Sequence, residues 1–301
     1  MTTHRPLAAA LWMSGAIFSF TAMAVAGRAV AATHDTFEIM MWRSAVGFLL
    51  VLAVAGSLRR LREVRTDRMG QHVIRNLFHF SGQNLWFWAL TMIPLAQVFA
   101  LEFTSPIWVI LLSPLVLGER LTRPRLIAAG MGFAGILIVA RPNFAALDPG
   151  VIAAAASALC FAATTLMTKK LTRGESIVSI LFWLTLMQGS FGLVTAGWDG
   201  TIHLPTAQTL PWLALIGFCG LLAHLCLTTA LSLAPASYVV PIDFIRLPVI
   251  VVVGILLYHE PLDPLVILGA VVIFAGNWVN IRAETRKPAT PARSQTGDAA
   301  S

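Results

Sequence analysis

The sequence has little charge for its length. Only 12% of its 301 residues are Asp, Glu, Lys or Arg, 57% are hydrophobic, and the mean hydropathy is +0.78. Soluble proteins average about 25% charged residues, because charge is needed to cover a surface that faces water. The shortage of charge therefore excludes a soluble globular protein and predicts an integral membrane protein.

Cysteine is also scarce, and the motifs of metal sites and hydrolases are missing. Cys160, Cys219 and Cys226 all lie in apolar runs, without the spacing of metal ligands. The sequence has no His-Glu-x-x-His run, no Gly-x-Ser-x-Gly elbow and no cluster of Cys and His. We therefore expect no disulfide, no metal and no cofactor, and an intramembrane enzyme is only a remote alternative.

Long apolar runs take up most of the chain. A spanning helix needs about 20 mostly apolar residues, and continuous runs favour helices over a β-barrel. The first run imitates a secretory signal peptide, but we expect it to remain as a helix, because its loss would leave nine runs. The ten runs cover approximately residues 7–26, 38–57, 72–92, 96–116, 126–140, 150–168, 177–198, 210–231, 237–258 and 265–281.

Basic residues gather in alternate connecting segments. Short loops rich in Lys and Arg face the cytoplasm. If residues 1–6 are cytoplasmic, the inner segments hold most of the basic residues, and the outer segments hold only Arg28 and Arg141. This predicts an inner-membrane protein with both termini in the cytoplasm and a disordered tail at 284–301. The net charge of +7 then belongs to the membrane surface and not to a nucleic-acid partner.

An internal repeat organises the chain. A gap-free shift of 141 positions places Pro94 on Pro235, Glu102 on Asp243, Glu119 on Glu260 and Gly135 on Gly276. The turn after Glu119 is rich in arginine and the turn after Glu260 has none, so the two turns should lie on opposite sides of the membrane and the two copies should be inverted relative to each other. We predict an all-α fold of ten transmembrane helices in two inverted five-helix repeats, residues 7–141 and 149–283, with a binding site at their interface.

Polar residues inside the predicted helices are the candidates for that site. They are costly in a bilayer unless they meet water or one another. Arg75, His79 and Gln83 recur at i, i+4 and i+8 and therefore share one helix face. With aromatic residues near them, the candidate substrate-binding residues are His79, Gln83, Trp86, Phe99, Glu102, His224, Asp243 and Arg246.

Other charges and prolines predict structural or gating roles. Asp243 and Arg246 are i, i+3 neighbours and predict an ion pair. Arg43 either extends to the membrane interface or pairs with Glu102, which lies at similar depth. A proline in a helix interior frees backbone carbonyls, as in the broken helices that line transporter cavities. The structural or gating candidates are Arg43, Pro106, Pro248, Glu119 and Glu260.

Four segments carry a family resemblance: "LGERLTRPRLIAAGMGFAGILIVA", its partner "LLYHEPLDPLVILGAVVIFAGNWV", "MMWRSAVGFLL" and "ALTMIPLAQVFALEFTSPIWVIL". They resemble the drug/metabolite transporter superfamily in its ten-helix EamA-type branch. The resemblance implies a monomer with a central cavity that closes alternately on each side, supported by the fifth and tenth helices. The aromatic-rich third helix is most similar to YddG-type exporters of aromatic and other neutral amino acids.

These features together predict a secondary transporter of a small organic solute. Acidic, basic and aromatic candidates suit a zwitterion, so we expect export of neutral or aromatic amino acids by alternating access. If protons are coupled, Glu102, Asp243, His79 or His224 would carry them. The alternatives are exchange or export of other metabolites, such as drugs, nucleotide sugars or phosphorylated solutes, and passive uptake by a facilitator.

The inverted repeat makes a prediction about loop exposure. Single cysteines at Arg123→Cys and Asp263→Cys, in a variant whose native cysteines are replaced, should react with a membrane-impermeant maleimide from opposite sides. The labelling is measured on intact cells and on inverted vesicles. Reaction of both positions from the same side would contradict the repeat.

Overall fold

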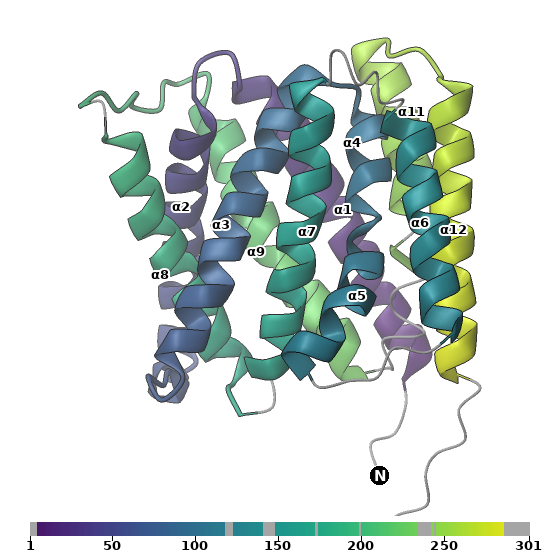
Figure 1. The fold of residues 1–301 in the computed structure, drawn as a ribbon. Coiled ribbons are helices and arrows are strands. Elements are labelled where there is room, and N and C mark those ends of the chain that lie inside the picture. The colour runs from purple at the N-terminus through teal and green to yellow at the C-terminus, as the bar shows by residue number, and fades with distance from the viewer. Residues whose placement is uncertain are drawn as a thin grey trace, which may run out of the picture.

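The computed structural model describes residues 5–117, 123–140, 148–171, 174–198, 200–233, 242–243 and 245–285. These residues form a bundle of helices without strands (Figure 1), which confirms the all-α prediction. The helices are α1 Pro6–Val30, α2 Thr36–Ser57, η1 Leu61–Glu63, α3 Met69–Met92, α4 Leu95–Glu102, α5 Ser105–Leu117, α6 Arg123–Ala140, α7 Pro149–Leu171, α8 Ile177–Ala196, α9 Leu210–Leu233, α11 Arg246–Tyr258 and α12 Pro264–Thr285. By length and composition, α1, α2, α7, α8 and α9 can each cross a membrane.

The capped starts of α2 and α8 are separated by the same number of positions as the internal sequence repeat. The Asp35 carboxylate accepts the Glu38 amide at 2.8 Å and caps α2, and the Ser176 hydroxyl accepts the Ser179 amide at 3.1 Å and caps α8. Such side chains satisfy amides that have no partner inside the helix. The two caps are 141 positions apart, so the two repeats begin their second helix in the same way.

The two halves run in opposite directions. Gly150, at the start of α7, lies against Met92 and Ile93 near the end of α3. The side chain of Arg28, near the end of α1, bonds to backbone carbonyls in that same region. The start of α7 therefore lies where its counterpart α1 ends, as Figure 1 also shows. This is the inverted arrangement that the sequence predicts.

Helix packing follows the same relation. The most extensive contacts join α1 to α9, α3 to α7, α2 to α8 and α6 to α12. Exchange of the two halves converts the first pair into the second and leaves the other two pairs unchanged. The α6 and α12 pair lies at one edge of the bundle (Figure 1), away from the helices that meet at its centre.

The fourth predicted span is two helices and not one. α4 ends at Glu102 and α5 begins at Ser105, and the Thr104 amide bonds to the Leu101 carbonyl at 3.0 Å between them. Pro106 is the second residue of α5 and Pro248 is the third residue of α11. A proline is tolerated in a first turn, where its missing amide costs no bond. The two prolines therefore lie in the first turn of their helices. The prediction that each one interrupts the interior of a helix is wrong.

Two glycines set the distance between α6 and α12. A Cβ at Gly135 would lie 2.8 Å from the Gly269 carbonyl oxygen, and a Cβ at Gly269 would lie 2.8 Å from that of Gly135. Backbones approach this closely only where side chains are absent, as is common in membrane helix pairs. Gly130, on the same helix, has nothing within 4 Å of the corresponding position.

We expect Gly135→Ala to destabilise the protein and Gly130→Ala to leave it unchanged or slightly stabilised. The first substitution forces two backbones apart at a cost of about 1–3 kcal/mol, whereas the second only improves helix propensity. Thermal unfolding in detergent measures both. Equal midpoints for the two variants would contradict close packing at this pair.

Candidate functional site

A buried charge cluster lies where two helix ends meet. Glu102 is the last residue of α4, and Arg246 is the first residue of α11. Arg246 Nη2 is 2.9 Å from Glu102 Oε1 and 3.0 Å from Asp243 Oδ2. The predicted pair between Asp243 and Arg246 is therefore confirmed. Glu102 and Asp243 occupy equivalent positions of the two repeats, so related carboxylates from both halves share one guanidinium.

Aromatic side chains enclose this guanidinium. Its central carbon lies 4.8 Å from the ring centre of Phe20, 5.2 Å from that of Phe99 and 5.0 Å from that of Phe103. The Trp86 indole donates a hydrogen bond to Glu102 Oε2 at 2.8 Å. Ring faces attract a desolvated cation, and a planar guanidinium stacks on them well. Charge pairs and rings together replace the water that Arg246 loses.

Two atoms of the cluster remain open for a further bond. Asp243 Oδ1 and Arg246 Nε are buried and have no hydrogen-bond partner among the described residues. A buried polar atom without a partner costs about 1–3 kcal/mol, and native proteins leave few such atoms unpaired. The cluster thus offers one acceptor and one donor that no described residue uses.

A tract of histidines continues from the cluster. The ring centres of His79 on α3 and His224 on α9 are 5.2 Å apart. Phe20 packs on His224 and Phe161 packs on His79, with ring centres 6.1 and 6.2 Å apart. Both nitrogens of His79, and Nε2 of His224, are buried without a partner among the described residues. Because Phe20 also contacts Arg246, the tract and the charge cluster are continuous.

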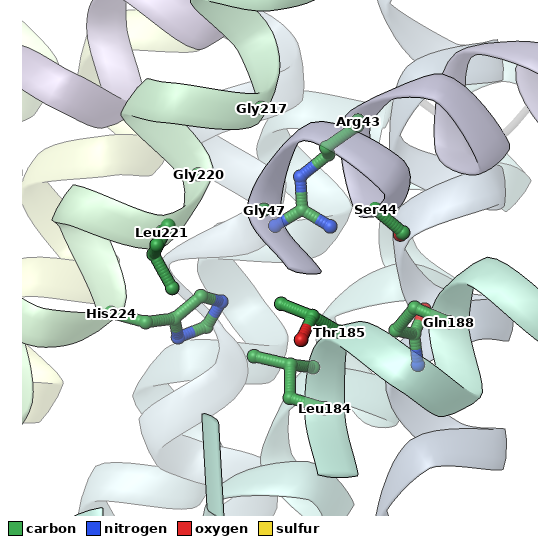
Figure 2. A pocket seen from close by; sticks show the side chains of 10 residues that line it. All are labelled: Arg43, Ser44, Gly47, Leu184, Thr185, Gln188, Gly217, Gly220, Leu221 and His224. Carbon is green, nitrogen blue, oxygen red and sulfur yellow. The ribbon is translucent and has the colours of Figure 1, made fainter. Parts of the chain in front are cut away.

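Gln83 and Arg43 complete the polar interior. Gln83 is buried on α3, and its carbonyl oxygen has no partner in the described part of the chain. Arg43 on α2 is 6% exposed and makes no ion pair with any described residue. Its predicted pairing with Glu102 is wrong, because Glu102 bonds to Arg246 and Trp86. The alternative that it extends to the membrane interface is wrong too, because its side chain points into the bundle (Figure 2).

Arg43 faces a small polar cavity between α2, α8 and α9. The volume open to the centre of a water-sized sphere is about 10 Å³, which is close to the space for one water molecule. The cavity is too small for an organic solute in this conformation. It is lined by Arg43, Ser44, Gly47, Leu184, Thr185, Gln188, Gly217, Gly220, Leu221 and His224 (Figure 2).

A second ion pair lies near one end of the bundle. Arg28 pairs with Glu260, and it also donates to the carbonyls of Leu90 and Ile93 at 2.6 Å. Glu260 in turn accepts the Leu95 amide at 2.9 Å. The pair therefore joins the ends of α1 and α3 to the start of α4 and to the turn after α11. A depression of about 480 Å³ opens beside it. Glu119, the counterpart of Glu260, lies outside the described residues.

Three residues of these candidate sites were not predicted from the sequence. Phe20, Phe161 and Arg28 were not among the candidates, although Phe20 and Phe161 coincide under the shift of 141 positions. Aromatic residues are common in apolar runs, so their coincidence carried little weight. Arg28 could have been found as one of two basic residues in the predicted outer segments.

Comparison with known proteins gives consistent matches along the chain. The model of the EamA-like transporter family matches residues 7–141 and 148–282. A riboflavin transporter of Rhizobium johnstonii is 31% identical over 96% of this chain and 95% of its own. A riboflavin transporter of Vibrio cholerae is 30% identical over 94% and 96%. An S-adenosylmethionine uptake transporter of Rickettsia conorii is 24% identical over 87% and 88%.

One solved structure shares the fold. It has a TM-score of 0.66 to this structure, covers 92% of this chain and 98% of its own, and is 18% identical. At that identity the likeness concerns the arrangement of the helices alone.

Two tryptophans on α3 allow a test of the charge cluster. Trp86→Phe should lower the midpoint of thermal unfolding, because it leaves Glu102 Oε2 without its donor at a cost of about 1–3 kcal/mol. Trp88→Phe is the matched control, since Trp88 is 43% exposed on the same helix. Unfolding in detergent is followed by size-exclusion chromatography after heating. A larger loss for Trp88→Phe than for Trp86→Phe would contradict the bond.

Proposed function

The chain belongs to the EamA-like transporter family of the drug/metabolite transporter superfamily, and we propose that it is a secondary transporter that takes up riboflavin or a related flavin. The cargo is proposed from the relatives named riboflavin transporter, one of which matches 96% of the chain. The central charge cluster between the two halves is the observation that carries the mechanism. No enzymatic step is part of the proposal.

Riboflavin can form hydrogen bonds with the two unpartnered atoms of the cluster, Asp243 Oδ1 and Arg246 Nε. Its planar ring system ends in an imide edge, with an N–H between two carbonyls, and it carries a polyhydroxylated chain. Asp243 Oδ1 can accept the N–H and Arg246 Nε can donate to a neighbouring carbonyl. Phe99 and Trp86 can pack on the flat rings, since aromatic rings prefer offset-stacked or edge-to-face contact. Gln83 and His79 can bond to the hydroxyl groups, and His224 lies beside His79.

The solute must enter by a conformational change. Phe99 and Trp86 are at most 2% exposed and Arg246 is 4% exposed, so a flavin has no path to them in this conformation. In the proposal, the two halves first separate at one end of the bundle and admit the solute. The solute then bonds to Asp243 Oδ1 and Arg246 Nε, after which the first end closes and the opposite end opens. Glu260 and Pro106 would act in these movements, as would Glu119 and Pro248.

The proposed cargo and direction differ from the amino-acid export expected from the sequence. The relatives in hand are named for riboflavin and S-adenosylmethionine, and none of their names supports amino acids or export. Uptake is proposed because the S-adenosylmethionine relatives are named uptake transporters. Both termini are proposed to lie in the cytoplasm, which rests on the distribution of basic residues.

S-adenosylmethionine is the second candidate cargo. It shares with riboflavin a planar nitrogen heterocycle joined to a five-carbon unit that carries hydroxyl groups, a sugar in one and an open chain in the other. Its amino and carboxylate groups could bind Asp243 and Arg246 respectively. The lower identity to the relatives of that name, 24% in one case, places it behind riboflavin.

We expect proteoliposomes with the purified protein to accumulate labelled riboflavin faster than empty vesicles. Excess unlabelled riboflavin should compete, and excess tryptophan should not. S-adenosylmethionine is added as a separate competitor, and each assay is run with and without a pH gradient to test for proton coupling. Riboflavin flux equal to that of empty vesicles, together with uptake of labelled amino acids, would contradict the proposal.

Variants of the cluster sharpen this test. Arg246→Lys keeps the charge but loses the planar donor edge, so flux should fall at least tenfold. Arg123→Lys is the control, since Arg123 is exposed at the start of α6. Equal flux from the two variants would contradict a role of Arg246 in binding the solute.

A further inference from the structure

Arg43 is a buried cation without a counter-charge among the described residues. It is 6% exposed, and its Nε has no hydrogen-bond partner among the described residues. Both acidic residues of the central cluster are bound to Arg246 instead. An unpaired charge inside a membrane protein is expensive and normally faces a partner or a polar cavity. Something other than a described carboxylate must therefore balance Arg43.

The cavity in front of Arg43 carries further unused polar groups. The Ser44 hydroxyl and His224 Nε2 line it, are buried, and have no hydrogen-bond partner among the described residues. Figure 2 shows the guanidinium reaching between Ser44 and His224 towards Thr185. Arg43, the Ser44 hydroxyl and His224 can each donate a hydrogen bond, and His224 does so when its proton is on Nε2. The Thr185 hydroxyl already donates to the Leu181 carbonyl at 3.0 Å. Gln188 Oε1 is an unpartnered acceptor in the same lining, and it can accept from Ser44 or Arg43.

The surrounding backbone is shaped to hold the guanidinium. A Cβ at Gly220 would lie 2.6 Å from Arg43 Nε and 2.8 Å from Nη2. Any residue larger than glycine there would displace the arginine. Under the repeat, Gly220 is the counterpart of His79, so the second half has a gap where the first half has a ring.

We propose that this cavity binds a small monovalent inorganic anion, of the size of chloride. The donors are on the walls, the guanidinium supplies the balancing charge, and the volume of about 10 Å³ admits one occupant of about the size of a water molecule. Charge-assisted hydrogen bonds to an anion are about twice as strong as neutral ones. Because α2 belongs to the first half and α9 to the second, a bound anion links the two halves. The inference does not depend on which solute is carried.

We expect chloride to stabilise the purified protein in a saturable way. At a tenfold excess over the dissociation constant, the midpoint of thermal unfolding should rise by about 3 °C relative to gluconate at equal ionic strength. Bromide should replace chloride, and bound radioactive chloride should be measurable at one site per chain. Identical midpoints in chloride and gluconate would overturn the proposal and leave water as the occupant.

Two arginine variants test the location of the site. Arg43→Gln should abolish chloride binding and the difference between the two salts. Arg75→Gln is the control, since Arg75 is a buried arginine whose Nε bonds to Thr168 Oγ1 at 2.9 Å. It should keep the chloride response even if its midpoint falls. A response that persists in Arg43→Gln, or that vanishes equally in Arg75→Gln, would contradict the assignment to this cavity.

A weaker second variant keeps the test valid if Arg43→Gln does not fold. Ser44→Ala removes one donor and should raise the dissociation constant for chloride about tenfold. A stabilisation seen only with flavin phosphate, and not with chloride, would contradict the proposal that the cavity binds an inorganic anion. The Arg43 guanidinium would then be assigned to binding of the solute.

Discussion

One shared guanidinium holds the centre of this protein together. Arg246 neutralises carboxylates that come from both halves, and it does so where α4 ends and α11 begins. Ion pairs taken out of water gain little unless their remaining bonds are also made. Here three rings and one indole donor supply the additional contacts, while one acceptor and one donor have no partner among the described residues. The proposed solute would complete the bonds of these two atoms.

The helix breaks explain why these charges can lie so deep. A continuous helix would bond its carbonyls internally and present only side chains. The turn at Phe103 and Thr104 separates α4 from α5, so that Glu102 lies at the end of a helix. Arg246 begins a helix on the other half, and the two ends come within hydrogen-bond distance. Irregular backbone at this depth is tolerated where it is buried in protein or lines a cavity.

The sequence predicts the repeat, the helices and the local ion pair, but not the contacts between distant segments. Asp243 and Arg246 lie one turn apart, so spacing alone predicts that they meet. Arg246 and Glu102 are 144 positions apart, and no local pattern joins them. Arg43 was placed beside Glu102 because both lie at similar depth, but depth along a helix does not say which face a side chain occupies. The aromatic rings around Arg246 could not be told apart from the many others in apolar helices.

Equivalent helix pairs of the two repeats are packed differently at the two ends of the bundle. Among the described residues, α7 packs extensively against α5, whereas the counterpart pair, α1 and α11, makes only sparse contact. The sparse side is bridged by Arg28 and Glu260 and holds the depression of about 480 Å³. In the proposed alternating access, the two halves would adopt each other's packing, so that α1 and α11 close together while α5 and α7 separate. Opening the present looser end requires breaking one ion pair and its bonds to Leu90, Ile93 and Leu95, whereas opening the other end requires separating a packed apolar surface. In that proposal, the end at Arg28 would be the first to open.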